Sequence, residues 1–576
     1  MRRRLVSIST LALAFIAAIA PPGNAQRVLG VGDDALVLPR GIFRLRLIGN
    51  WTGFNERYGK DTPGRPDGAL EPLGVDFTLD TIGVKQFPNL ATLQGGLRTL
   101  TGNPNWSATL GNTNVILRDR VTAYPIVFDL GLTNRISLAV MVPYVQTHSS
   151  VFFNVNTNGT QGNLGFNPGT IGANAAAVTQ NTTMYTQFIA ASNALEGSLA
   201  ACQANPAVSP SCPALLANQA SASALITQSR LFAGGTVGPV GGAFSPTGGV
   251  YIASPFVPIV GTDAQLSIES RVQAFKALYA SFLGAGNPIT TNGPFASQNR
   301  LTLPDAQRIL TATAFGIVAD PLTSTSHSHV GDTDIGAKFS LFDSFGGSTS
   351  DARYSPKGVN LRAAVAGVLR LPTGQVESAN NFVDVGTGRG ATTLEGRGYV
   401  DLLLGSRFWQ SFVVRFNKPF SDTQEMRIID LPNQELAPEY RRQTVDRTLG
   451  SAFEFETTPR IVLNDFFAIS GQYVYRHKAQ DHYKGTFTIP QAVTGYADIT
   501  LDASTLDLET EQSEHRLGGG ISFSNMYAFE QGKVKVPFEV TYLHWQTVRG
   551  AGGNQPKFFT DQIALRLYAK LFGAAK

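Results

Sequence analysis

The stretch from Phe559 to Phe572 reads FTDQIALRLYAKLF and decides the fold. Ile563, Leu565 and Leu567 fall on one face, and Gln562 and Arg566 fall on the other. Successive side chains of a strand point to opposite faces, so this period of two predicts a β-strand and not a helix. Because the pattern recurs along the chain behind an export signal, we expect the apolar face to contact lipid. The strand is predicted to close a transmembrane β-barrel against the first strand.

The same alternation indicates about twelve strands in all. The predicted strands are 41–55, 113–132, 135–154, 329–343, 358–371, 396–408, 410–427, 443–457, 465–479, 512–525, 533–547 and 559–572. Most are long enough for the roughly 9–11 residues that a tilted strand needs to cross a bilayer. An even number is typical of single-chain bacterial barrels. The sequence therefore predicts an all-β protein built as an antiparallel transmembrane barrel.

The connections between these strands alternate in length. The short gaps are 133–134, 344–357, 409, 458–464 and 526–532. The long gaps are 56–112, 155–328, 372–395, 428–442, 480–511 and 548–558. Short periplasmic turns and long external loops are typical of outer-membrane barrels. An exported water-soluble β-protein is the alternative, but it gives no reason for this alternation.

The first 25 residues resemble a cleavable signal peptide. Arg2, Arg3 and Arg4 form a positive start, an apolar run follows from Leu5, and Gly23-Asn24-Ala25 offers a cleavage site. The mature chain is expected to begin at Gln26, and an uncleaved anchor is the alternative. No later run of about 18 apolar residues predicts a helical span. The predicted location is the outer membrane of a Gram-negative cell.

Composition agrees with a barrel wall and excludes some partners. The chain has 576 residues, of which only 15% are charged and 59 are glycine. Low charge without a long apolar run is typical of a wall in which every second residue is polar. The formal net charge of +4 is small for this length and gives no reason to expect nucleic acid.

The predicted organisation is a signal peptide at 1–25, first strands within 26–154, an external insertion at 155–328 and the remaining barrel at 329–576. Helices are expected within the insertion at about 183–201, 214–231 and 263–285. In the third helix an apolar stripe is expected, formed by Leu266, Val272, Phe275, Leu278 and Phe282. The insertion is interpreted either as a cap or gate of the barrel, or as a lid without a role in transport.

The insertion holds the only two cysteines, Cys202 and Cys212. An even count in an oxidising compartment favours a disulfide between them, and two free thiols are the alternative. None of the seven histidines lies in a recognisable catalytic context. His327-Ser328-His329 offers two imidazoles without a placed third ligand, so no metal site, cofactor or enzymatic activity is predicted.

The polar phase of the strands should face the lumen. The candidates for lumen-facing residues are Arg362, Arg370, Arg407, Arg415, Arg516, Arg566, Lys338, Asp334, Asp401, Glu454, Glu456 and Glu539. Further basic residues of the same phase are Arg44, Arg46, Arg476, Lys533, Lys535 and Lys570. The basic side chains outnumber the acidic ones on this assignment. They are interpreted as a bracing network, or as a positive lumen that favours anionic solutes.

The number of strands also limits the width of the lumen. About eight strands leave an interior filled by side chains, and about 16 to 18 leave an aqueous channel. Twelve strands therefore predict a narrow or partly plugged lumen. The segments that could plug it are Gln26–Gly41, 57–112 and the insertion, with a short helix expected over Phe87–Leu100.

Three short segments carry a resemblance to a known family. They are GLTNRISLAVMVPYV at Gly131–Val145, VGDTDIGAKFSLF at Val330–Phe342, and LRLPTG at Leu369–Gly374 followed by GTGRG at Gly386–Gly390. They resemble the outer-membrane transporter family associated with phenol meta-pathway degradation (MetA-like proteins). The resemblance covers much of the barrel wall and none of the insertion.

The resemblance implies a channel for passive passage of small hydrophobic or aromatic compounds, with anionic ones among the candidates. Its expected partners are outer-membrane lipid, the solute and the barrel assembly machinery. The alternative is a surface-exposed structural or adhesion barrel whose insertion binds a partner.

Overall fold

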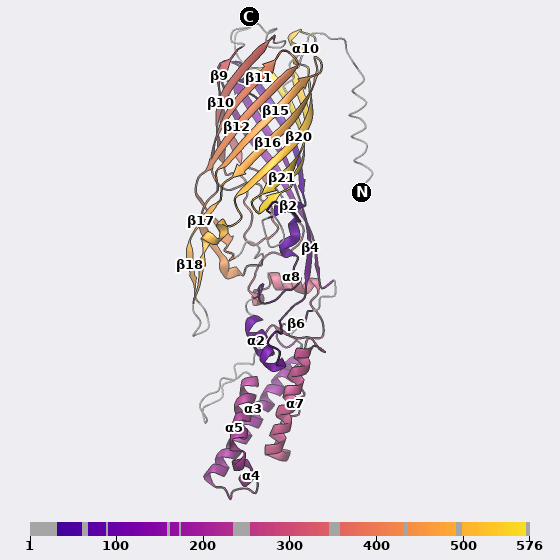
Figure 1. Ribbon diagram of the computed structural model, residues 1–576, viewed down its shortest axis with the longest axis vertical. Helices are drawn as coiled ribbons and strands as arrows, with labels where there is room; N and C mark the ends of the chain where they lie inside the picture. The colour runs from indigo at the N-terminus through magenta and orange to yellow at the C-terminus, as the bar shows by residue number, and fades with distance from the viewer. Residues whose placement is uncertain are drawn as a thin grey trace. The chain divides into compact units, whose positions relative to one another are not determined.

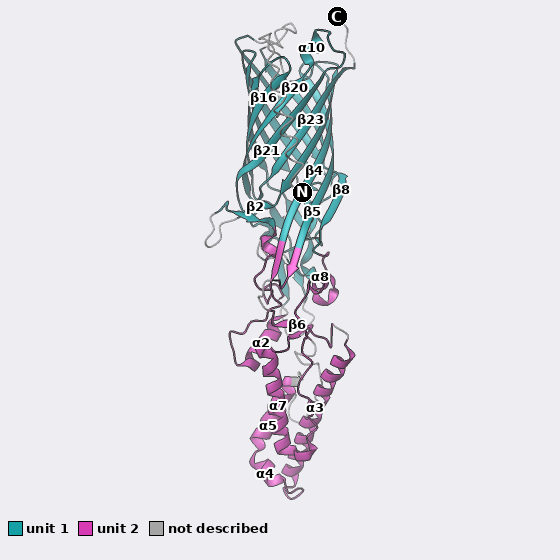
Figure 2. Cartoon of the chain, turned by 90° about the vertical axis from the view of Figure 1, so that its right-hand side faces the viewer, with its two compact units in different colours: residues 1–73, 116–152, 322–576 teal, residues 74–115, 153–321 magenta. Residues whose placement is uncertain are grey.

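The computed structural model describes residues 32–59, 67–87, 90–157, 162–171, 174–233, 254–344, 357–430, 436–490 and 498–571. The predicted signal peptide lies outside these residues and stays a prediction. The chain forms two compact units (Figure 2). One unit comprises residues 1–73, 116–152 and 322–576, and the other comprises 74–115 and 153–321. The first unit is the barrel and the second contains most of the helices.

Twelve antiparallel strands form a closed barrel, and Figure 1 shows this barrel with its tilted strands. They are β1 (Ile42–Phe54), β4 (Thr113–Gly131), β5 (Ile136–Val155), β9 (Thr333–Asp343), β10 (Val359–Leu371), β11 (Thr393–Leu404), β12 (Phe408–Pro419), β15 (Ala452–Val462), β16 (Phe467–Lys478), β20 (Gln512–Ser524), β21 (Phe538–Ala551) and β23 (Phe559–Lys570). Each pairs with its neighbours around the ring, and β4 pairs with both β1 and β5. The predicted fold class and strand number are confirmed.

The first and last strands close the barrel together, as the sequence predicts. β23 pairs with β1 over its whole length, with Arg46 opposite Arg566 and Leu47 opposite Leu565. No sheet edge remains in the ring, so every wall strand has a hydrogen-bonded neighbour on each side.

The two faces of the wall have opposite chemistry. Large apolar side chains on the outside are exposed, for example Leu47, Leu138 and Ile563. Charged side chains of the other phase are buried inside the barrel, and Arg362 and Asp401 are each only 3% exposed. A water-soluble protein has the reverse arrangement, so this is a transmembrane barrel. No described helix is long and apolar enough to cross a membrane.

Several predicted strands are longer than the observed ones, because each predicted segment covers a wall strand and part of a second element. The segment 410–427 divides at Pro419 into β12 and β13 (Asp422–Arg427), and 443–457 divides into β14 (Arg442–Thr448) and β15. The segment 329–343 includes part of β8 (Thr325–Val330) before β9. The segment 533–547 begins only at Phe538, after a short helix α10 (Met526–Glu530) and Pro537. β12 ends at Pro419 and β21 begins directly after Pro537, and proline cannot donate a hydrogen bond to a sheet ladder.

Small sheets lie in the long connections. β14 lies between β13 and β17 (His482–Lys484) in one sheet, and β18 (Thr486–Ile489) pairs with β19 (Ile499–Asp502). β2 (Glu56–Gly59) lies between β3 (Leu70–Pro72) and β22 (Asn554–Pro556). Ile428, Val445, Tyr483 and Leu501 share one apolar core. The connections β12–β15 and β16–β20 are therefore packed together.

The second unit contains α2 (Leu90–Thr101), α3 (Ala175–Ala204), α4 (Cys212–Ala217), α5 (Gln219–Ala233), α7 (Asp263–Leu283) and α8 (Leu303–Thr311), with a two-stranded sheet of β6 (Leu164–Phe166) and β7 (Phe256–Pro258). Phe188, Leu195, Val272 and Tyr279 belong to its core. The stripe predicted for α7 is only partly buried. Val272 and Phe275 are buried, whereas Leu266 and Leu278 are exposed and Tyr279 takes a core position instead.

Candidate functional site in the barrel lumen

Residues 32–41, here called the lumen segment, lie inside the barrel before β1 begins. The backbone amide of Ala35 donates a hydrogen bond to Asp401 Oδ2 at 3.0 Å. Ala35 is 3% exposed and packs against Ala364, Tyr399 and Val413. These three side chains come from the adjacent strands β10, β11 and β12. The lumen segment therefore lies along the inner face of this part of the wall.

Asp33 forms ion pairs with two arginines of the wall. Its Oδ2 lies 3.0 Å from Arg415 Nη2 and 3.7 Å from Arg397 Nη1. Burial raises the pKa of the Asp33 carboxyl, but the charges of Arg415 and Arg397 more than reverse this effect. The pKa of Asp33 therefore lies well below its ordinary value. The side chain keeps 33% of its surface exposed, so the ion pairs face a solvated space.

Asp34 interacts with Lys338 on β9. Lys338 Nζ donates to the backbone carbonyl oxygen of Asp34 and lies 3.9 Å from its carboxylate. The same ammonium lies 4.0 Å from the ring centroid of Tyr399, which is a cation–π contact. Burial raises the pKa of Asp34, and the charges of Lys338 and Arg566 outweigh it, so this pKa is also lowered. Both aspartates stay ionised at neutral pH.

The lumen segment leaves the barrel at the end that carries the short turns. The amide of Gly41 donates to the carbonyl of Gly131 at 2.8 Å, and the amide of Arg40 donates to Asn134 Oδ1 at 3.1 Å. A side chain at Gly131 would collide with the backbone carbonyl of Pro39. Glycine at 131 thus lets the chain pass close to the end of β4 and enter β1.

Other ion pairs brace the wall itself. Asp129 accepts hydrogen bonds from Arg44 at 2.9 Å and from Arg46 at 2.8 Å. Glu539 lies 3.2 Å from Arg566, and Asp334 accepts two hydrogen bonds from Arg370. Arg415 also contacts Glu454, and it contacts Glu456 at 2.7 Å. Most of these guanidinium groups therefore have a carboxylate partner on a neighbouring strand.

The structure places eleven of the twelve candidate lumen residues on the inner face, whereas Lys533 and Lys535 of the further basic set are exposed and precede β21. The inner-face residues are Asp334, Lys338, Arg362, Arg370, Asp401, Arg415, Glu454, Glu456, Arg516, Glu539 and Arg566. Arg407 instead lies in the turn between β11 and β12, where its carbonyl oxygen accepts a hydrogen bond from the Val462 amide. The turn occupies residues 405–407 and not residue 409 as predicted, so Trp409 lies in β12. The Arg460 guanidinium lies 5.1 Å from the centre of the Trp409 ring.

Sequence reasoning missed several inner-face residues. They are Asp129, Glu395, Arg397, Arg460, Glu514 and the two aspartates of the lumen segment. Glu395 and Arg397 have the same phase as Asp401; Arg397 already lay in the predicted strand 396–408, and extending that strand by one residue would have added Glu395. The added carboxylates bring the lumen close to charge balance, unlike the excess of basic residues expected from the sequence.

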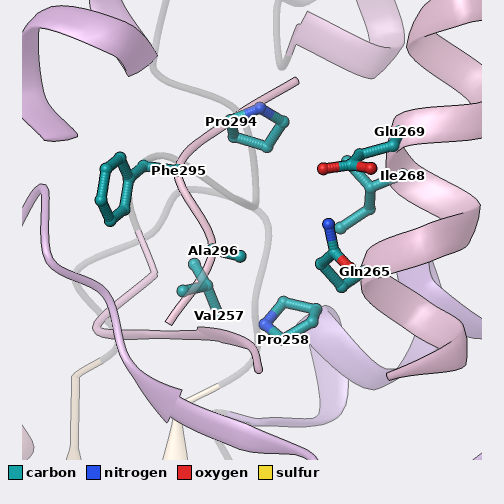
Figure 3. Close-up of a pocket in the computed structure, with 8 residues that line it drawn as sticks. All are labelled: Val257, Pro258, Gln265, Ile268, Glu269, Pro294, Phe295 and Ala296. Atoms are coloured by element: carbon teal, nitrogen blue, oxygen red, sulfur yellow. The ribbon is translucent and has the colours of Figure 1, made fainter. Parts of the chain in front are cut away.

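The second unit has clefts of its own, and one of about 730 Å³ is lined by Trp106, Asp263 and Arg271 among others. A disulfide links Cys202 to Cys212. Figure 3 shows a cleft in which Gln265, Ile268 and Glu269 project from α7 toward the loop that carries Pro294 to Ala296. Its interior leaves only about 10 Å³ for solvent, which is room for about one water molecule.

Among the described residues, no group of three histidine, cysteine or acidic side chains could hold a metal ion. His327 lies 2.9 Å from Asp384, a residue of the connection between β10 and β11. The contact ties β8 to that connection.

No family model and no curated protein matches this chain. Among solved structures, an outer membrane channel from Pseudomonas putida F1 is 7% identical, with a TM-score of 0.37 over 96% of this chain and 100% of that chain. The toluene transporter TodX of P. putida is 9% identical, with a TM-score of 0.22 over 93% and 92%. The toluene transporter TbuX of Ralstonia pickettii is 8% identical, with a TM-score of 0.25 over 94% and 91%.

TM-scores this low identify no site residue, and the site of this chain is defined by its own geometry. That geometry is a closed twelve-stranded transmembrane barrel whose lumen holds a segment of its own chain, fixed by ion pairs to the wall.

Proposed function

We propose that this protein is an outer-membrane channel through which small hydrophobic or aromatic compounds pass without an energy source. The lumen segment restricts the lumen and moves aside when solute passes. The barrel would lie in outer-membrane lipid, where the barrel assembly machinery would insert it. No enzymatic step is part of this function.

The observation that carries the proposal is how the lumen segment is held. Residues 32–41 form no strand, so they share no continuous ladder of hydrogen bonds with the wall. They are held by side-chain contacts such as Asp33 with Arg415, and by single backbone bonds such as Ala35 with Asp401. Moving them would leave all twelve wall strands paired. A barrel filled by its own wall side chains would have no such removable part.

The surroundings of the lumen segment support a small, partly apolar solute. Ala364, Tyr399 and Val413 form an apolar surface that Ala35 and Val37 cover. An aromatic face and two aliphatic side chains offer contact area to an apolar compound. The charged groups on both sides of this apolar surface would keep the rest of the lumen hydrated. The resemblance to phenol-pathway transporters agrees with such a solute.

Single-channel recording in planar bilayers tests the proposal. The full chain should give small conductance steps in symmetric KCl, and a variant that lacks residues 26–38 should give larger and longer steps. Heat modifiability on gels would show that both barrels are folded. Folded barrels without any conductance, or two proteins with the same conductance, would contradict the proposal.

A further inference from the structure

The lumen segment brings two carboxylates to a part of the wall that has more positive than negative charges. The wall cations whose charges act on Asp33 or Asp34 are Arg44, Arg46, Lys338, Arg362, Arg397, Arg415, Arg460 and Arg566. The wall carboxylates that pair with these cations are Asp129, Glu395, Asp401, Glu454, Glu456 and Glu539. The cations exceed the carboxylates by two. Asp33 and Asp34 add two carboxylates to this part of the lumen.

We propose that Asp33 occupies a binding site for the carboxylate of a transported solute, and that Arg397 and Arg415 form this site. The inference rests on the proposed function and names its solute class. The solute is a monocarboxylate with a compact aromatic or branched apolar body. Asp33 stands in for its carboxylate while the lumen segment is in place.

The wall holds both guanidinium groups in position independently of the lumen segment. Arg415 is bound to Glu454 through Nη1 and to Glu456 through Nη2, and Nη2 also reaches Asp33. Arg397 is bound through Nε to Glu395 at 2.5 Å and offers Nη1 to Asp33. Each arginine therefore keeps a donor for a carboxylate that does not belong to the wall. Such preorganised donors favour binding, because little side-chain ordering remains to be done.

An apolar surface adjoins this pair of arginines, and it determines that the part of the solute next to the carboxylate is apolar. Tyr399 and Val413 each lie two residues from one of the arginines, on the same inner face of the same strands. Ala35, two residues after Asp33, covers both side chains together with Ala364. A carboxylate joined to a ring of benzoate size would place its charge at Asp33 and its ring at Ala35.

The charge state of Asp33 makes it a competitor for the arginines at neutral pH. Its pKa lies well below the ordinary value, because the charges of Arg415 and Arg397 outweigh the effect of burial. A solute carboxylate must therefore displace an ionised group. Removing the charge of the lumen segment should leave the arginines free for the solute.

Titration calorimetry of the refolded full chain in detergent micelles tests the inference with benzoate and its neutral analogue benzamide. In the variant D33N/D34N, benzoate should bind at least about tenfold more tightly than in the parent protein, because the internal competitor is lost. Benzamide should bind neither protein measurably. D320N changes an exposed aspartate of the other unit and should behave as the parent. Adding R397Q to D33N/D34N should remove the gain.

Equal binding of benzoate and benzamide, or equal benzoate affinity in D33N/D34N and the parent, would overturn the inference. The single variant D33N gives the same test if the double variant fails to refold. The inference and the proposed function can fail separately. A conducting barrel that does not distinguish benzoate from benzamide would leave the channel intact and remove the carboxylate site. A barrel that binds benzoate as expected but never conducts would keep the site and refute the channel.

Discussion

At the scale of single residues, Asp129 shows how the lumen tolerates so much buried charge. Its carboxylate accepts hydrogen bonds from both Arg44 and Arg46, and only 6% of the side chain is exposed. One carboxylate thus compensates two guanidinium groups on the neighbouring strand. A buried charge that loses its partner is costly, whereas a complete pair is roughly neutral for stability.

We therefore expect the variant D129N to lower the free energy of unfolding by about 3 kcal/mol, because two arginines would lose their buried anion. Urea titration in micelles, followed by tryptophan fluorescence, measures this change. D80N alters an exposed aspartate of the other unit and serves as the matched control. Coinciding unfolding midpoints for D129N and D80N would show that Asp129 does not hold the arginines.

The two aspartates of the lumen segment determine how the open probability of the channel should depend on pH. Their pKa values are lowered in the folded protein, so their ion pairs contribute fully above the pKa of an unfolded aspartate, about 3.9. This contribution is lost only as the pH falls through the lower folded values. The single-channel open probability should therefore stay constant from pH 7 to pH 5. A rise at pH 5 would mean that other titrating groups hold the segment.

The sequence predicts which face of a strand a lumen residue occupies, but it does not predict which residue is its ion-pair partner. Alternation along a strand assigns Asp401, Glu456 and Arg566 to the inner face, and the structure places them there. The same rule cannot pair Asp33 with Arg415. The two residues are 382 positions apart, and Asp33 lies in the lumen segment, which is not a strand. Partners across the lumen depend on the closed barrel, which no local pattern contains.

At the scale of elements, the lumen segment differs from the strands that surround it. Ala35 fits between Ala364, Tyr399 and Val413 with almost no exposed surface. Only a small side chain fits there. Inserting extra methylene groups into such a packed place costs about 1–3 kcal/mol.

The variant A35L should push the lumen segment away from the wall and raise the mean conductance of the refolded protein. The barrel strands should remain folded, because their ladder does not involve residue 35. Planar-bilayer recording in KCl measures the change. A207L adds the same side chain at an exposed position of the helical unit and should leave conductance unaltered. Identical conductance in A35L and A207L would show that the segment does not restrict the lumen.

The disulfide Cys202–Cys212 joins the end of α3 to the start of α4, and both cysteines belong to the helical core. A disulfide that closes a loop of this length stabilises the folded state by about 3 kcal/mol, because it lowers the entropy of the unfolded chain. In C202A/C212A, amides of 175–233 should exchange hydrogen faster, and amides of 452–478 in the barrel should not change. Hydrogen exchange with mass spectrometry measures both regions in one sample. Unchanged exchange in 175–233 would mean that packing alone holds these helices.

Element boundaries could be predicted only where a single environment determines them. The strand predicted at 358–371 matches β10 closely, because no second strand continues the chain directly beyond Leu371. The segment 410–427 is predicted as one strand, yet β12 stays in the wall and β13 joins a different sheet beyond Pro419. Alternation is the same in a lipid-facing strand and in a loop sheet, so the sequence pattern alone could not separate them.

At the scale of the whole molecule, the chain divides its residues between a charged barrel and a helical unit with an apolar core. The ion pairs that fix Asp33 and Asp34 all belong to the barrel unit. The disulfide and the buried aromatic residues Phe188 and Phe275 belong to the helical unit. One deletion can therefore separate the proposed transport through the barrel from any role of the helical unit.

Replacing residues 158–321 by a short Gly/Ser linker should leave a folded barrel, because β5, β8, β9 and every other wall strand remain. Ion selectivity, measured as the reversal potential in a KCl gradient, should equal that of the full chain, because the deletion removes no residue of the lumen segment or of its ion pairs. A changed selectivity would assign the helical unit to the conduction path as a gate. A deletion variant with unchanged selectivity but lost binding to a cell surface or protein partner would instead assign that unit to recognition, and would keep the barrel as the transporting part of the molecule.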